Sequence, residues 1–159
     1  AHGYQKESVQ MFEKAQQWVE SRPQKERDSA DGRNLLGRIL MYLERWTEAQ
    51  ARFETLLKES PSEIVYISFC GQLAAIMGDR GKALSFSKQL EDNKTPYLFG
   101  TPTYNRALIA AFLGDKEDAV NLIREAISQG YAYPSIHGTM ALERLKDYPP
   151  YIQLMKPKG

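Results

Sequence analysis

Residues 34–61 read NLLGRILMYLERWTEAQARFETLLKESP, and they contain the clearest pattern in the chain. Small residues stand at Gly37 and Ala49 among larger apolar ones. The alanine recurs 34 residues later at Ala83, and again 36 residues after that at Ala119. A fixed period of this length is typical of stacked helix-turn-helix units. The sequence therefore predicts an all-α protein with about three helical hairpins.

The recurring small residues have a physical reason. Two antiparallel helices approach closely only where the side chains between them are small, and enlarging one would cost about 1–3 kcal/mol. Three such crossings are expected: Gly37 with Ala49, Gly71 with Ala83, and Ala107 with Ala119. Trp46 and Phe53 would fill the gap to the next pair. The alternative, that these are unrelated amphipathic helices of a bundle, stays open.

Two Gly-Asp pairs are expected to end first helices, at Gly78-Asp79 and Gly114-Asp115. Glycine adopts positive φ at no steric cost, and an aspartate can cap the helix that follows. Cys70 is expected to be a buried small hydrophobic residue, because it occupies an inward-facing position of the second copy.

Several residues match the consensus of one known repeat when the two sequences are aligned in a single register. The best copy carries Leu36, Gly37, Ala49, Phe53 and Pro61. The segment from Ala30 to about Gly130 therefore resembles three tetratricopeptide repeats (TPR). Thr95 and Arg106 depart from the family pattern, since a closing proline and an apolar residue usually occupy these places.

The resemblance implies a right-handed α-solenoid, a TPR-like helical domain that acts as a scaffold. The repeats would occupy residues 30–63, 64–99 and 100–133 within the region 30–130. An N-terminal helix and linker at 1–27, either half a repeat or a cap, would precede them. A C-terminal cap at 134–159 would follow.

Apolar periodicity also sets the expected helix bounds. The expected helices are Tyr4 to about Ser21, Ala30–Leu43, Thr47–Lys58, Ser62–Met77, Arg80–Leu90, Pro102–Leu113, Lys116–Ser128, Met140–Leu145 and Pro149–Met155. Residues 22–27 are expected to be a polar connection, and residues 131–134 to be extended or turning. Residues 140–155 are similar to the closing segment of bacterial tetratricopeptide proteins. That similarity implies the C-terminal part of a larger protein, with a signalling, regulatory or enzymatic domain upstream.

Composition excludes several classes of partner. Lys and Arg number 21 against 20 Asp and Glu, so no charge excess favours nucleic acid or a membrane surface. No stretch approaches the roughly 20 apolar residues that span a bilayer. No signal peptide is visible, so we expect a cytoplasmic protein. A single cysteine excludes an internal disulfide framework.

Catalytic patterns are missing from the sequence, and we expect no enzyme activity. The two histidines, His2 and His137, have no metal-binding spacing, so no metal site is expected. No glycine loop is suited to phosphate, and no cofactor is expected. Acidic residues stand near Lys and Arg along the helices, which is typical of a solvated face. A Cys70–His137 nucleophile and base is a remote alternative.

A stack of helix pairs offers a concave groove lined by the first helices. The residues predicted to line it are Asn34, Arg38, Met41, Tyr42, Phe69, Gln72, Ile76, Tyr104, Asn105 and Phe112. This set is apolar and aromatic, and Arg38 is its one charged member. Family members that grip the acidic tails of heat-shock chaperones use a clamp of Lys, Arg and Asn, which is absent here. We therefore expect a peptide or helix with an apolar face, anchored by Phe69, Tyr104 and Phe112.

The leading hypothesis is a non-catalytic protein-protein interaction module. A second hypothesis is a structural or regulatory segment that packs against another domain of the same polypeptide. Self-association as a homo-oligomer is also open, because Trp18 and the first helix would expose apolar surface. A groove filled by the chain itself is the remaining alternative.

Overall fold

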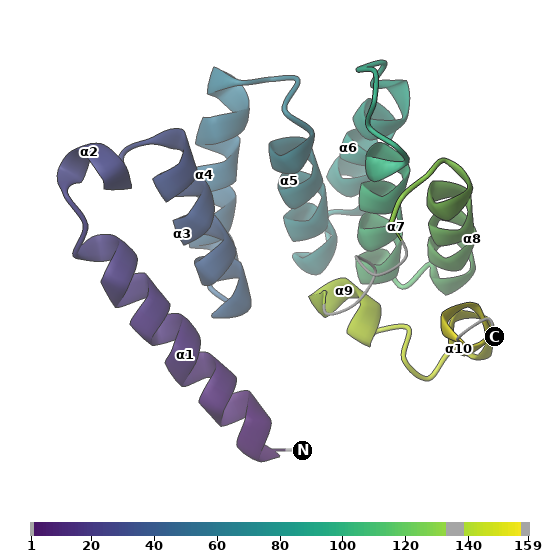
Figure 1. Cartoon of the computed structure of the whole chain (residues 1–159), viewed down its shortest axis with the longest axis horizontal. Helices are drawn as coiled ribbons and strands as arrows, with labels where there is room; N and C mark the ends of the chain where they lie inside the picture. Colours follow the sequence, from purple (N-terminus) through teal and green to yellow (C-terminus); the bar gives the residue numbers. More distant parts are fainter. Residues whose placement is uncertain (1, 133–138, 157–159) are drawn as a thin grey trace. The chain divides into compact units, whose positions relative to one another are not determined.

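The computed structural model describes residues 2–132 and 139–156, and these are all-helical, without a strand (Figure 1). The helices are α1 (His2–Glu20), α2 (Gln24–Arg27), α3 (Ala30–Tyr42), α4 (Trp46–Glu59), α5 (Ile64–Ile76), α6 (Arg80–Asp92), α7 (Thr101–Leu113), α8 (Lys116–Ser128), α9 (Met140–Glu143) and α10 (Pro149–Met155). Residues 133–138, which include the start of the expected cap and His137, lie outside the described residues. No helix in the described ranges is long and apolar enough to cross a membrane.

The longer helices begin and end within two residues of the expected bounds. The segment 22–27 differs, because the expected connection contains the single-turn helix α2. Pro23 precedes α2 with φ −51°, and an ion pair of 2.8 Å joins Arg22 to Glu26. No residue of α2 is buried, so the helix leaves no apolar periodicity in the sequence.

The chain forms two compact units, Ala1–Tyr66 and Ile67–Gly159. In the first unit, α3 packs against α4, and α1 and α2 pack against α3. In the second unit, α7 packs against both α6 and α8, while α9 contacts α7 and α10 contacts α8. Consecutive helices thus pack as pairs within each unit.

Small residues allow the helices to approach, and the atoms nearest to two of the glycines belong to large side chains. A Cβ on Gly37 would lie 2.9 Å from the ring of Phe53, which is fully buried and approaches more closely than Ala49. A Cβ on Gly71 would lie 2.5 Å from Ile109 Cδ1 and 3.0 Å from Phe86 Cβ. The glycines therefore leave room for large side chains, and Gly71 brings α5 against both α6 and α7.

The same turn closes three successive helix pairs. Its key residue has positive φ in each: 59° at Glu44, 83° at Gly78 and 84° at Gly114. The N–H of each key residue donates to the carbonyl three residues back, and the next N–H donates to the carbonyl five residues before it. This is the Schellman pattern of helix C-termini. Glycine was expected at two of these turns, whereas Glu44 occupies the first.

The turn predicts opposite effects of two substitutions. Glu44→Gly should raise the free energy of unfolding by about 0.5–1 kcal/mol, because the left-handed region strains a residue with a Cβ. Gly78→Ala should lower it by about 1 kcal/mol for the same reason, since nothing lies within 4 Å of the added Cβ. Urea denaturation followed by circular dichroism measures both. Equal stabilities of both variants and the wild type would contradict a strained turn.

Candidate functional site

The residues predicted to line the groove differ widely in exposure. Arg38 is exposed, and Asn34, Tyr42, Phe69, Ile76 and Asn105 are half-buried. Met41, Gln72, Tyr104 and Phe112 are buried. The ten residues come from both compact units, so each set is described within its own unit, and one groove shared by all of them stays a prediction.

In the first unit, α1 covers part of the α3 face. The ring of Phe12 on α1 stacks on Tyr42 with centroids 4.5 Å apart and planes 3° apart. Arg45 Nη1 also donates a hydrogen bond of 3.0 Å to Gln16 Oε1 on α1. Of the predicted residues on α3, Arg38 alone is classed as exposed, and it forms no ion pair with the described residues.

In α5, the side-chain amide of Gln72, one of the predicted groove residues, is hydrogen-bonded within its own helix. Gln72 Nε2 donates a hydrogen bond of 2.9 Å to Ser68 Oγ, and both residues are buried. Phe69 and Ile76 keep part of their apolar surface exposed. They lie seven residues apart and therefore share one face of the helix.

In α7, later parts of the chain cover the predicted aromatic residues. Tyr131 stacks on Tyr104 with centroids 4.2 Å apart, and burial raises the pKa of the Tyr131 hydroxyl. The Arg144 guanidinium lies 5.2 Å from the Phe112 ring centre and donates a 3.2 Å hydrogen bond to its carbonyl. Tyr104 and Phe112 therefore contribute to internal packing, and Asn105 keeps a partly exposed amide.

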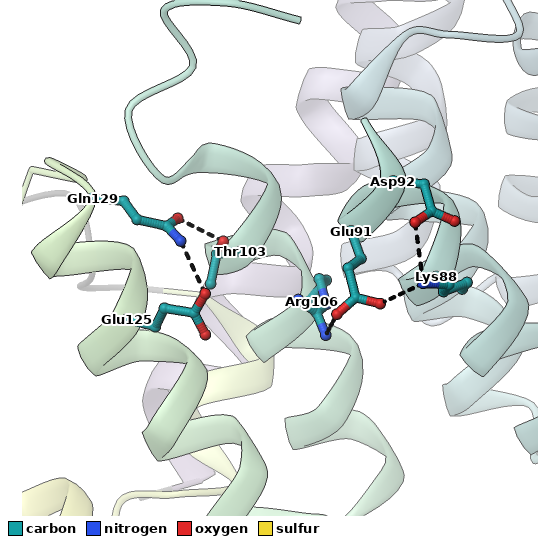
Figure 2. Close-up of polar contacts among 7 residues, drawn as sticks. All are labelled: Lys88, Glu91, Asp92, Thr103, Arg106, Glu125 and Gln129. Atoms are coloured by element: carbon teal, nitrogen blue, oxygen red, sulfur yellow. Dashed lines mark hydrogen bonds and ion pairs between the residues drawn. The ribbon is translucent and has the colours of Figure 1, made fainter. Parts of the chain in front are cut away.

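Two polar networks join the helices of the second unit (Figure 2). Between α6 and α7, Glu91 lies 2.9 Å from Lys88 Nζ and 2.9 Å from Arg106 Nη2. Between α7 and α8, the Thr103 hydroxyl donates a 2.6 Å hydrogen bond to Gln129 Oε1. Each network links two helices that also pack against each other.

Arg106 now has a structural role. The sequence showed it as a departure from the apolar residue usual in the repeat, and the structure pairs its guanidinium with Glu91. The hydrogen bond from Lys88, followed by the charge of Arg106, lowers the pKa of the Glu91 carboxyl. The Arg106 Nε atom is buried without a hydrogen-bond partner.

Sequence reasoning missed the residues that cover the predicted face. Periodicity places Phe12 on the apolar face of the first expected helix, but it does not indicate that Phe12 covers Tyr42. Tyr131 and Arg144 lie at the edge of the repeats or beyond them, so no periodic position identified them. The one available signal was an aromatic residue soon after the last helix of the three expected repeats, as at Tyr131, which lies three residues beyond Ser128.

Among the described residues, no group of three or more His, Cys, Asp or Glu is placed to hold a metal ion. Cys70 is buried, as expected. His137, its remote candidate partner, lies outside the described ranges. The polar clusters among the described residues are ion pairs and hydrogen bonds within single helices or between neighbouring ones.

No family model, curated protein or solved structure matches the chain. The tetratricopeptide resemblance therefore depends on the residues and geometry of this chain alone.

The Glu91 network predicts a pH-dependent contribution to stability. A carboxyl whose pKa is lower in the folded state stabilises the fold above its unfolded pKa, and this is lost as pH falls through the folded value. Glu91→Gln should therefore lower the free energy of unfolding slightly near pH 7 and have no effect near about pH 3. Urea denaturation at both pH values measures the difference.

Glu117→Gln is the matched control, because Glu117 is exposed on α8 and pairs with no cation in the described part of the chain. A loss with Glu91→Gln that is equal at both pH values would show that the carboxylate charge is not responsible.

Proposed function

We propose that this chain is a helical-repeat interaction module of the tetratricopeptide type. In this proposal, three repeats form a right-handed α-solenoid that binds a protein or peptide without catalysing a reaction. The proposal combines the sequence period with the packed helix pairs of each unit.

The recurring turn is the observation that supports the proposal most. Glu44, Gly78 and Gly114 have the same backbone conformation and hydrogen bonds at the spacing of the sequence repeat. Unrelated helices of a bundle have no reason to end alike at intervals as similar as 34 and 36 residues. Stacked copies of one supersecondary unit do, because each copy must present the same faces to its neighbours.

Partial exposure suggests where a ligand would bind. Phe69 and Ile76 lie two helical turns apart on α5, a distance of about 10 Å along the axis. Gly71 brings α5 against α7, which carries the partly exposed amide of Asn105. An amphipathic helix or extended segment would fit these contacts with apolar side chains at a similar separation.

Charge argues for an apolar ligand rather than an acidic tail. The predicted groove residues on α5 and α7 include no Lys or Arg, so no cation would pair with a terminal carboxylate there. Tyr104 and Phe112, first expected as anchors, pack against Tyr131 and Arg144. We therefore assign the anchoring role to Phe69 and Ile76.

Selection from a displayed library of random peptides tests this function. Peptides enriched on the full chain should carry apolar residues at helical spacing, and Phe69→Ala should weaken their binding by about tenfold or more, because aromatic anchors dominate such interfaces. Binding is measured by fluorescence anisotropy with synthetic copies of the enriched peptides.

Phe99→Ala is the control, because Phe99 is 64% exposed in a loop and lies outside the predicted groove. Circular dichroism confirms that both variants keep their helices. Equal binding by both variants would exclude the α5 face as the site.

The exposed face of α1 favours a second candidate function. Met11 is 71% exposed and Trp18 is 57% exposed, and their separation of seven residues places them on one side of the helix. We propose that this face packs against another folded body. That body is either a second copy of the chain or another domain of the same polypeptide.

Sedimentation velocity at low and high protein concentration tests the second-copy form. The wild-type chain should associate as its concentration rises, and a Met11→Ser/Trp18→Ser double variant should stay monomeric. Both positions are exposed, so the double variant should keep its fold, and circular dichroism checks this. A wild-type monomer at every concentration would exclude self-association through α1.

A further inference from the structure

The second unit contains a groove between α6 and α8, with α7 as its floor. Its volume is about 370 Å³, and its apolar residues include Leu84, Leu113 and Leu122. Leu84 is 47% exposed on α6, so much of its apolar side chain is accessible at the groove. The groove has room for apolar side chains from a partner, and it is separate from the predicted groove residues on α5.

The charges around this groove are unbalanced. Arg106, the one cation that lines it, is paired with Glu91 (Figure 2). Asp115 is paired with Arg80 at 2.8 Å, and Arg80 also attracts Asp118, so one cation faces two carboxylates there.

The remaining acidic residue of the rim has a neutral partner. Glu125 accepts a 2.9 Å hydrogen bond from the Gln129 amide (Figure 2). The Asp118 side chain makes no hydrogen bond or ion pair with the residues that the structure describes. Two negative charges, those of Asp118 and Glu125, are therefore left without a cation of their own.

The spacing of these residues defines the shape of a complementary partner. Asp118, Leu122 and Glu125 occupy positions i, i+4 and i+7 of α8, so they share one face. The two carboxylates lie about 10 Å apart along the axis, with the leucine between them. Another helix lying along α8 would meet them with cations seven residues apart and apolar residues midway.

We propose that the groove between α6 and α8 binds a cationic amphipathic helix of a partner protein. Lysine or arginine of the partner would pair with Asp118 and Glu125, and its apolar residues would contact Leu84 and Leu122. Helices bind to apolar grooves in this way, and the charges select the partner and its direction. This surface is additional to the α5 face, and it does not depend on the repeat classification.

A designed peptide tests the proposal with the full chain. The probe is a synthetic peptide of about 16 residues, acetylated and amidated at its ends, with lysines seven residues apart, two leucines midway and alanines elsewhere. A second peptide has glutamate in place of lysine. The lysine peptide should bind saturably in fluorescence anisotropy, about tenfold more tightly than the glutamate peptide, and added salt should weaken it.

Two matched pairs of variants locate the binding. Asp118→Lys should lower the affinity for the lysine peptide by about threefold to tenfold more than Glu117→Lys does. Glu117→Lys makes the same charge change outside the groove. Leu84→Asn should also lower the affinity for the lysine peptide. Met77→Asn, which changes another exposed apolar residue, should leave the affinity unchanged.

Several results would overturn the proposal. One is an equal loss of affinity in Asp118→Lys and Glu117→Lys. The others are equal binding of the two peptides and no binding of the lysine peptide. Loss of binding with Phe69→Ala but not with Asp118→Lys would place the peptide on the α5 face instead. Self-association of the chain that Asp118→Lys abolishes would show that a second copy occupies the groove.

Discussion

The architecture depends on how each helix pair is closed. A residue with positive φ reverses the chain after the first helix, and two backbone hydrogen bonds satisfy carbonyls that the helix end would leave open. Because the turn is short, the two helices must lie side by side from their first contact. Small residues such as Gly37 and Gly71 are then required where a large neighbouring side chain enters. The turn thus sets the geometry, and the small residues allow it.

Much of this fold was predictable from the sequence. Apolar periodicity gave the bounds of the longer helices, because each of them buries one face. The turn at Glu44 was not predictable from composition, since a non-glycine residue at positive φ has no reliable signature. Helix α2 was missed because it buries nothing. Periodicity identified which positions recur, and the contacts that each position makes depended on packing.

The candidate site was less predictable than the fold. Periodicity identifies residues that face inward from a first helix, but it cannot say which part of the chain covers them. Tyr104 and Phe112 had the right phase, and they pack against Tyr131 and Arg144, which lie beyond the repeats. Arg106 occupies a position that is usually apolar in the repeat, and its guanidinium forms an ion pair with Glu91. Contacts between residues distant in sequence decide which side chains remain available.

The contacts of Tyr131 and Arg144 with α7 also have a consequence for the integrity of the chain. Tyr131 precedes the segment 133–138 in the sequence and covers the ring of Tyr104. Arg144 follows that segment and covers the ring of Phe112. Proteolytic cleavage after Gly130 would remove both shields together and leave two large aromatic side chains facing water. Such a fragment would be prone to aggregate through its exposed apolar surface. Tyr131 and Arg144 therefore keep aromatic surface of α7 away from water in the intact chain.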